Sequence, residues 1–266
     1  MKTGCLGPIG SYSHEAAKRL CLGGEIVPYK TFPAVVHSLL CGETDQIVLP
    51  IENTIQGGVL QNMDLLAENE DLFAVKQYTL PIDHRLVKRQ GVEESKIKRV
   101  FSHPQALGQC SDYLSERLPQ AQTVPTSSTA QSLSSMERED DACIVGYHLC
   151  KDLTGYSVSE ATIANEKKNF TYFQLVKKGK ENLGHSQRVY FMAELPDVPG
   201  SLYHLLGVID RFGLNMNKIE SRPIKDRPGE YRFFIEIEGD YLSQKITSAL
   251  QEIACNCKKC KLLGCY

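Results

Sequence analysis

The sequence predicts an α/β protein made of a large region with two lobes and a small C-terminal module. Residues 1–176 alternate short apolar, β-prone runs with helical patterns, as in sheets covered by helices. The charged stretch 177–182 is typical of a linker between domains. Residues 185–266 then follow the order strand, helix, strand, strand, helix, strand, which is the ferredoxin-like order βαββαβ.

The first strand is expected over residues 3–6, followed by the turn 7–11 and a helix over 12–21. Ser11 and Ser13 are candidate N-caps for this helix. A strand, a glycine-containing turn and a helix N-terminus expose backbone N–H groups that suit an anion, although a plain strand-to-helix connection fits the same residues.

A buried strand is expected over residues 46–51, ending at Pro50. The polar residues Glu52 and Asn53 follow it. Open α/β sheets bind ligands at the carboxyl ends of their strands, so both side chains are candidates for ligand contact.

The remaining elements of the first lobe are two helices and a strand, over residues 31–40, 59–67 and 73–80. Residues 81–87 continue in an extended conformation and are expected to cross to a second lobe. The first lobe then comprises about residues 1–80 and 160–180, and the second about 81–159.

The second lobe repeats the pattern of strands followed by helices. Strands are expected over 99–102 and 141–146, helices over 105–118 and 147–153, and a strand, a hydroxyl-rich turn and a helix start over 123–128. Ser102 ends a strand and Gln109 lies on the next helix. His103 is a candidate general acid, although a His before Pro is more typical of a helix cap. Thr126 and Ser127 can cap a helix or hold an anion.

The strand expected over residues 170–176 carries a hydroxyl side chain inside an apolar run. Side chains alternate along a strand, so Thr171 and Phe173 face one side and Tyr172 faces the other. Thr171 and Tyr172 are therefore predicted not to share a pocket.

The C-terminal module is expected to contain four strands and two helices. The strands cover 188–195, 216–221, 231–237 and 260–265, and the helices cover 202–212 and 243–254. The first helix is amphipathic, which fits packing of both helices on one face of a sheet.

The composition favours a small metabolite or another protein as the partner. The 266 residues carry a formal net charge of −2, with 30 basic and 32 acidic side chains and no basic arm, so nucleic acid and membrane surfaces are poor candidates. No apolar run is long enough to span a bilayer, and the N-terminal residues lack the layout of a signal peptide. We therefore expect a cytoplasmic protein.

Ten cysteines in a chain with no export signal are expected to be reduced thiols. Four of them, Cys255, Cys257, Cys260 and Cys265, lie close together, and a zinc site is conceivable there. Their spacing matches no usual paired Cys-x-x-Cys pattern, so we predict no metal.

Five motifs along the chain resemble those of the prephenate dehydratases, in the order in which that family carries them. Residues 7–13, GPIGSYS, are similar to the family's opening motif, and residues 50–53 are its PIEN. Residues 102–110, SHPQALGQC, match its SHPQALxQC at every fixed position. Residues 199–202, PGSL, and 219–223, IESRP, resemble motifs of the amino-acid-binding ACT domain that follows the catalytic region.

The resemblance implies a catalytic region over residues 1–180, built from two α/β lobes like a type 2 periplasmic binding protein, with prephenate in the cleft. It implies an ACT regulatory domain over residues 185–266. The reaction removes water and carbon dioxide from prephenate, leaves phenylpyruvate and needs no cofactor. L-phenylalanine is the implied effector, bound at ACT interfaces in a homodimer or homotetramer.

The resemblance also implies roles for catalytic residues. Thr171 corresponds to the threonine thought to protonate the leaving hydroxyl. Asn53, Ser102 and Gln109 correspond to polar residues that line the site. Glu52 is a further candidate for ordering this network.

The implied ligand contacts fall into two sets. The substrate-binding residues are Ser11, Thr126, Ser127 and Phe173, and the helix starts near Ser11 and Ser127 suit the substrate carboxylates. The effector-binding residues belong to the two ACT motifs: Pro199, Gly200, Ser201, Leu202, Glu220, Ser221, Arg222 and Pro223.

Two positions depart from the family pattern. Tyr172 stands where the family has Arg, and Asn165 stands where an Asp is common. Loss of both members of an ion pair costs less than loss of one, because an orphaned buried charge is expensive. We therefore interpret the missing Arg as part of the support behind the site.

Other functions stay open. If the missing Arg held a substrate carboxylate, the protein is catalytically weak, altered in substrate, or an inactive amino-acid-sensing regulator. The retained polar residues argue against an inactive regulator: Thr171, Asn53, Ser102 and Gln109. Arogenate dehydratase is an alternative on the same fold, and no residue of the sequence separates it from prephenate dehydratase.

Overall fold

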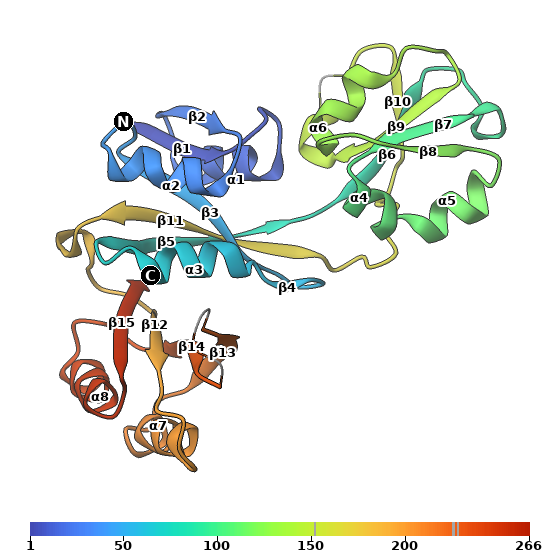
Figure 1. The fold of residues 1–266 in the computed structure, drawn as a ribbon. Helices are drawn as coiled ribbons and strands as arrows, with labels where there is room; N and C mark the ends of the chain where they lie inside the picture. The colour runs from blue at the N-terminus through green and yellow to red at the C-terminus, as the bar shows by residue number, and fades with distance from the viewer. Residues whose placement is uncertain (152, 225–226, 228) are drawn as a thin grey trace.

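The computed structural model describes residues 1–151, 153–224, 227 and 229–266. Figure 1 shows three groups of elements: a first lobe in blue and cyan, a second lobe mainly in green, and a C-terminal module in orange and red. This arrangement confirms the predicted α/β class with two lobes and a βαββαβ module. Within the described residues, no helix is long and apolar enough to cross a membrane.

The first lobe is built on a mixed sheet with the strand order β5-β11-β3-β1-β2. Its strands are β1 (Lys2–Leu6), β2 (Glu25–Tyr29), β3 (Gln46–Asn53), β4 (Gly57–Gly58), β5 (Leu72–Pro81) and β11 (Phe170–Lys178). Its helices are α1 (Tyr12–Leu20), α2 (Phe32–Leu40) and α3 (Leu60–Glu68). Strand β11 returns from the second lobe and runs antiparallel between β3 and β5.

Strand β3 is the middle strand of this sheet, and both of its faces are covered. Ile47, Leu49 and Ile51 pack in a cluster with α2 and α3, and Val48 packs on the opposite face against α1. A strand buried on both faces is a continuous apolar run rather than an alternating one.

The prediction that this strand ends at Pro50 is wrong, since β3 continues to Asn53. The pairing of β3 with β11 shifts register between Tyr172 and Phe173, and Phe173 lies opposite Pro50. A bulge accommodates a residue that has no N–H to donate. The extension carries Asn53 to the carboxyl end of a central strand.

The second lobe is built on a sheet with the order β10-β6-β9-β7-β8. Its strands are β6 (His84–Arg89), β7 (Arg99–Ser102), β8 (Gln122–Pro125), β9 (Asp141–Gly146) and β10 (Tyr156–Val158). Its helices are α4 (Pro104–Gln109), α5 (Ser111–Arg117) and α6 (Thr129–Ser132). Residues 82–83 and 159–169 connect the two lobes.

Two predicted helices of this lobe are shorter than expected. The helix predicted over 105–118 breaks at Cys110, whose φ of −115° and ψ of 16° lie outside the α-helical region. The helix predicted over 147–153 is a 3₁₀ turn, Tyr147–Leu149, and residue 152 of that prediction lies outside the described residues.

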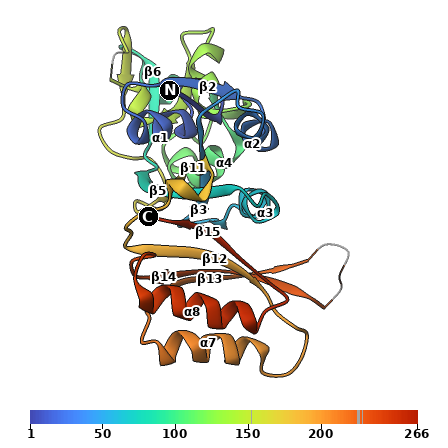
Figure 2. The same ribbon diagram turned by 90° about the vertical axis from the view of Figure 1, so that its left-hand side faces the viewer.

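The C-terminal module has the sheet order β13-β14-β12-β15 of a ferredoxin-like fold. Its strands are β12 (Arg188–Glu194), β13 (Met216–Pro223), β14 (Tyr231–Glu238) and β15 (Lys259–Cys265), and its helices are α7 (Ser201–Arg211) and α8 (Gln244–Cys255). Figure 2 shows that both helices cover one face of the sheet and that the other face is turned toward the first lobe.

An apolar core joins the module to the first lobe. The module contributes four side chains to the cluster around α2, α3 and β3: Tyr190, Met192, Phe234 and Leu263. Strand β15 also pairs with β5 at Gly264, opposite Ala74, so the two sheets are continuous. A Cβ at Gly264 would lie 2.3 Å from the carbonyl oxygen of Ala74, so only glycine permits this approach.

Candidate active site

Strands β3 and β11 end side by side, and this brings Asn53 opposite Thr171. Asn53 Nδ2 donates hydrogen bonds to Thr171 Oγ1 at 3.0 Å and to Asn169 Oδ1 at 2.7 Å. All three residues are buried, with Thr171 8% exposed. A buried amide and a buried hydroxyl therefore meet at the carboxyl end of a central strand.

Backbone groups fix the orientation of the Asn53 amide. Its Oδ1 accepts the N–H groups of Ile55 and Gln56 at 3.0 and 3.1 Å. A backbone N–H can only donate, so the amide oxygen faces this turn and the NH₂ group faces Thr171. Thr171 Oγ1 accepts from Asn53, and its own proton is available to an acceptor in the cleft.

Thr171 and Asn53 border a cleft of about 250 Å³ between the two lobes. The polar lining comes from both lobes: Ser11, Tyr12, Asn53, His84, His103, Gln105, Gln109, Ser127, Ser128, Thr129 and Thr171. No Asp, Glu, Lys or Arg among the described residues lines it. Hydrogen bonds from hydroxyl, amide, imidazole and backbone groups would thus hold an anion there.

Helix starts place several of these groups at the cleft. Ser11 is the N-cap of α1 and accepts the N–H of His14 at 3.2 Å, as the sequence predicted. His103 is the N-cap of α4, and its Nδ1 accepts the N–H of Gln105 at 3.3 Å. Ser128 caps α6. These contacts explain why polar side chains gather where strands lead into helices.

Gln109, at the end of α4, is held through its side-chain oxygen. His84 Nε2 lies 3.0 Å from Gln109 Oε1, and Asn169 Nδ2 donates to the same oxygen at 3.3 Å. Burial lowers the pKa of His84 below its usual value, so its imidazole is neutral at about pH 7. Tyr12 OH lies 3.3 Å from His84 Nδ1, and burial raises the pKa of this phenol, which stays protonated.

Five of the predicted catalytic and substrate-binding residues line the cleft: Ser11, Asn53, Gln109, Ser127 and Thr171. They come from β3, β11, the starts of α1 and α6 and the end of α4. The fold therefore brings together polar residues that the sequence separates by more than one hundred positions.

Three further predicted residues lie outside the cleft lining. Ser102 is fully buried, and its Oγ donates to the carbonyl of Ile144 at 2.7 Å, which ties β7 to β9. Thr126 Oγ1 donates to the carbonyl of Ser128 at 2.9 Å. Phe173 is 2% exposed and packs in the apolar core against α1. Their side chains hold the walls of the cleft instead of opening into it.

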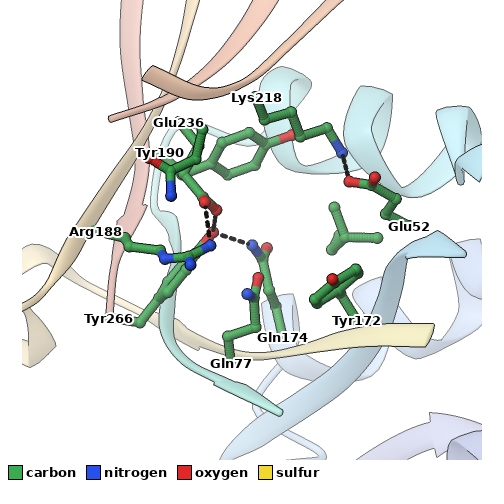
Figure 3. Close-up of a pocket in the computed structure, with 11 residues that line it drawn as sticks. Glu52, Gln77, Tyr172, Gln174, Arg188, Tyr190, Lys218, Glu236 and Tyr266 are labelled. Carbon is green, nitrogen blue, oxygen red and sulfur yellow. Dashed lines mark hydrogen bonds and ion pairs between the residues drawn. The ribbon is translucent and has the colours of Figure 1, made fainter. Parts of the chain in front are cut away.

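Glu52 and Tyr172 face the opposite side of the sheet, toward the C-terminal module (Figure 3). They line a polar cavity of about 120 Å³, where Glu52 pairs with Lys218 of β13 at 2.5 Å. Tyr172 thus points away from Thr171, which confirms the alternation predicted for β11. Glu52 precedes Asn53 on the same strand, so its side chain is turned to the other face and does not reach the Thr171 network.

The wall of this cavity that the module forms also contains an ion pair. Arg188 contacts Glu236 at 2.7 Å, and Tyr266 donates to the same carboxylate at 2.6 Å. Gln174 of β11 donates to Tyr266 OH at 2.8 Å. The reverse face of the strand that carries Thr171 is therefore connected to the module by polar contacts (Figure 3).

The two departures from the family pattern lie in different places. Asn165, in the segment that connects the lobes, contacts the second lobe, where its Oδ1 accepts the N–H of Asp112 at 3.2 Å and its Nδ2 donates to Ser111 at 3.0 Å. Tyr172 faces the C-terminal module. The expectation that these positions replace the two members of one ion pair is wrong, because their contacts belong to separate parts of the fold.

Two residues of the network were missed in the sequence. His84 is 3% exposed in the strand that enters the second lobe, and Asn169 is 2% exposed just before β11. A polar residue within an apolar strand at a crossover was the available signal for His84. Nothing local distinguishes Asn169 from the exposed residues of the loop before it.

A surface pocket of about 370 Å³ lies at the start of α7 in the module. Gly200, Ser201 and Leu202 line it, and Gly200 has a φ of 87° that favours glycine. Pro199 is exposed beside these residues and is not part of the lining.

The second predicted effector motif lies on β13, and none of its residues lines this pocket, although Ser221 and Pro223 pair with the lining residues Phe233 and Tyr231 of β14. Arg222 contacts Asp64 of α3 through Nε at 2.9 Å and Nη2 at 2.5 Å, so its guanidinium is held in the contact with the first lobe. Glu220 also faces inward, whereas Ser221 and Pro223 are exposed. Within one chain, of the two motifs only the first contributes residues to the pocket lining.

The C-terminal thiols are spread over different environments. Cys255 is exposed, Cys257 and Cys260 are partly buried, and Cys265 is buried. In the part of the chain that the structure describes, no group of three or more His, Cys, Asp or Glu side chains is placed to hold a metal ion.

A two-lobed α/β region with a polar cleft between its lobes, followed by a ferredoxin-like module docked on one lobe, is the architecture of a ligand-binding protein with a second, smaller domain. The family model for prephenate dehydratase matches residues 3–181, and the model for the ACT domain matches residues 189–255. The chain belongs to the prephenate dehydratase family.

Individual relatives match over nearly the whole chain. A prephenate dehydratase of Lactococcus lactis subsp. cremoris is 33% identical over 100% of this chain and 97% of its own length, and one of Amycolatopsis methanolica is 30% identical over 98% and 86%. The structure of a prephenate dehydratase from Arthrobacter aurescens in complex with L-Phe is similar, with 30% identity, a TM-score of 0.87 and coverage of 99% of this chain and 89% of that one.

Proposed function

We propose that this protein catalyses the decarboxylating dehydration of prephenate to phenylpyruvate in L-phenylalanine biosynthesis. The bond from the ring to one carboxylate breaks, its electron pair enters the ring, and the C–O bond across the ring breaks as the leaving hydroxyl takes up a proton. The products are phenylpyruvate, carbon dioxide and water. The protein must hold the substrate in position and supply one proton.

The observation that carries the proposal is the hydrogen bond from Asn53 Nδ2 to Thr171 Oγ1 at the cleft. A threonine hydroxyl is a weak acid. Donation from a fixed amide stabilises the negative charge that develops on Oγ1 as its proton leaves. Thr171 is thus the proton donor for the leaving hydroxyl, and Asn53 is the group that polarises it.

The uncharged lining of the cleft supports this reaction. A carboxylate that leaves as carbon dioxide loses its charge, so a lysine or arginine paired with it would stabilise the substrate more than the transition state. Ser11, Ser127 and Gln109 offer neutral hydrogen bonds instead. Because position 172 faces away from this lining, its substitution by Tyr removes no cation from the cleft, which favours an active enzyme over an inactive regulator.

The direct test is an absorbance assay of purified protein with prephenate, with arogenate assayed in parallel. We expect phenylpyruvate from prephenate. Conversion of arogenate alone would assign the arogenate dehydratase alternative, and turnover of neither compound would leave the amino-acid-sensing regulator and overturn the proposal.

We infer that L-phenylalanine inhibits the enzyme through the ACT module. The pocket bordered by Gly200, Ser201 and Leu202 supports this inference, as does the similarity to a structure determined with L-Phe. The polar contacts between β13 and the first lobe offer a route by which L-phenylalanine binding to the module changes the positions of β3 and β11. A ligand shifts the enzyme only by binding its states unequally.

The regulatory proposal is tested by titrating L-phenylalanine while measuring rate and molecular mass. Gly200→Ala strains a residue with φ of 87° and should weaken inhibition without changing the uninhibited rate. Gly207→Ala, in the same helix α7 with only the Arg211 side chain within 4 Å of its Cβ, is the matched control and should respond as wild type. No response of wild type to L-phenylalanine in rate or mass would contradict the proposal.

We also propose that the protein forms a homodimer or homotetramer and is located in the cytoplasm. All ten cysteines are free thiols, which suits a reducing compartment. Within one chain no residue of the second effector motif lines the pocket, which favours a site completed by a second copy. Light scattering of the purified protein measures the assembly.

A further inference from the structure

We propose that His84 and Asn169 are positioning residues that hold the side-chain amide of Gln109 with its Nε2 directed into the cleft as a donor to a substrate oxygen, and that His84 does so as the Nε2–H tautomer. The identity of that oxygen rests on the proposed function, because it belongs to prephenate.

The orientation of the Asn53 amide does not depend on any ligand. The backbone N–H groups of Ile55 and Gln56 donate to its Oδ1, so the Nδ2 group must face the opposite way. Asn53 Nδ2 donates to Asn169 Oδ1 at 2.7 Å. This bond identifies which end of the Asn169 amide is the oxygen.

Asn169 in turn orients the side-chain amide of Gln109 in the second lobe. With its oxygen bound to Asn53, Asn169 presents its NH₂ group to Gln109, and Nδ2 donates to Oε1 at 3.3 Å. A donor requires an acceptor, so the oxygen of the Gln109 amide faces Asn169. The Nε2 group of Gln109 is thereby turned to the other side.

The side-chain nitrogen of Gln109 has no partner within the part of the protein that the structure describes. Gln109 lines the cleft, and its Nε2 is a buried atom without a hydrogen-bond partner in the described structure. Leaving a buried N–H unpaired costs free energy. We therefore expect this group to have a hydrogen-bond partner when substrate is bound. A carboxylate or hydroxyl oxygen of the substrate is such a partner.

The contacts of the His84 ring identify which of its nitrogens carries the proton. Its Nε2 lies 3.0 Å from Gln109 Oε1, which can only accept, so Nε2 carries the hydrogen. Its Nδ1 then carries no hydrogen; it lies 3.3 Å from Tyr12 OH, whose proton is donated to the carbonyl of Asp83 at 3.0 Å. Asn169 and His84 thus both donate to one oxygen, and a rotation of the Gln109 amide by 180° would lose both bonds.

The tautomer is tested directly by NMR of full-length protein labelled with ¹⁵N-histidine. The His84 signals are assigned from their loss in the His84→Gln variant. We expect a protonated Nε2 and an unprotonated Nδ1 near neutral pH. A proton on Nδ1 in place of Nε2 would overturn the proposal. This measurement needs no substrate, so it stands even if the protein does not turn over prephenate.

The positioning role is tested by kinetics on two variants that differ in a single contact. The amide nitrogen of His84→Gln reaches the place of Nε2 and keeps the donor, whereas that of His84→Asn reaches only the place of Nδ1. We expect kcat/KM for prephenate to fall about 10- to 100-fold in His84→Asn, the cost of one hydrogen bond to a charged group, and to be largely retained in His84→Gln. Asn169→Asp, which cannot donate to Gln109, should lose about as much.

A double-mutant cycle with Gln109→Ala separates positioning from general stability. If His84 acts through the Gln109 amide, adding His84→Asn to Gln109→Ala changes kcat/KM by less than about twofold. If the losses instead multiply in full, His84 supports the fold and not Gln109, and the proposal is wrong. Thermal unfolding of each variant confirms that folded protein is compared.

Discussion

Asn53 donates a hydrogen bond from Nδ2 to Oγ1 of Thr171 across the ends of β3 and β11, at 3.0 Å. This bond defines the direction of the Thr171 proton, because an oxygen that accepts from a fixed amide turns its own hydrogen elsewhere. The chemistry proposed for the cleft depends on this relationship more than on any other contact.

Replacing Asn53 by Asp should remove the polarising donor while keeping the acceptor for Ile55 and Gln56. The introduced carboxylate would accept the Thr171 proton, so we expect kcat to fall about 100-fold or more. Asn165→Asp is the matched control, since this residue is exposed and its Oδ1 also accepts a backbone N–H. Similar kcat values for the two variants in the prephenate assay would contradict the role of Asn53.

Tyr172 lines the cavity against the C-terminal module, so its substitution should not act on the reaction directly. We expect kcat of Tyr172→Arg and Tyr172→Phe to stay within about threefold of wild type, because neither change alters a group at the cleft. Steady-state rates with prephenate give the answer. A gain of an order of magnitude in Tyr172→Arg, with none in Tyr172→Phe, would show that a cation at this position takes part in catalysis.

Glu52 should affect regulation more than turnover, because its carboxylate is paired with Lys218 of β13. Both side chains are partly accessible, at 33% and 15%, so the pair is worth at most about 1 kcal/mol. We expect Glu52→Gln to keep kcat and to change the L-phenylalanine concentration for half inhibition by up to about fivefold. Lys218→Met should change it in the same direction. A loss of kcat in Glu52→Gln comparable to that of the Asn53 variant would show that Glu52 takes part in catalysis.

Lys261 of β15 makes stability depend on pH. It is 5% exposed, its Nζ donates to the carbonyls of Leu66 and Asn69 at the end of α3, and burial lowers its pKa to about 8. Because the folded pKa lies below that of an unfolded lysine, the unfolded state binds more protons between these values. Stability therefore rises with pH in this window.

From about pH 8 to pH 10 the contribution of Lys261 should grow by about 2 kcal/mol. Urea unfolding of wild type and of Lys261→Met over this range measures it, since the other titrating groups are common to both proteins. The free energy of unfolding of wild type minus that of Lys261→Met should increase with pH. A difference that stays constant or decreases would mean that the lysine is not desolvated in this contact.

Local rules predicted much of the fold and part of the site. Strand alternation alone separated Thr171 from Tyr172, and helix-start chemistry placed Ser11 at a cap. The same alternation applies to Glu52 and Asn53, yet their adjacency in one motif suggested a shared role. In the folded chain they face opposite sides of β3, one toward the cleft and one toward the module.

Contacts between distant segments account for the rest. Ser102 binds the carbonyl of Ile144, and Arg222 binds Asp64, which lies 158 residues away. Such partners depend on how sheets and domains pack, which periodicity does not encode. Asn169 takes its place in the site only because β11 returns to the first lobe beside β3.

The most direct test of the account is kcat for prephenate in Thr171→Ala compared with Thr171→Ser. Thr171→Ser keeps a hydroxyl that accepts from Asn53 and should stay within about tenfold of wild type. Thr171→Ala removes the proton donor and should lower kcat by about 10²- to 10⁴-fold. A Thr171→Ala variant that converts prephenate at the wild-type rate would contradict the assignment of Thr171 as the acid.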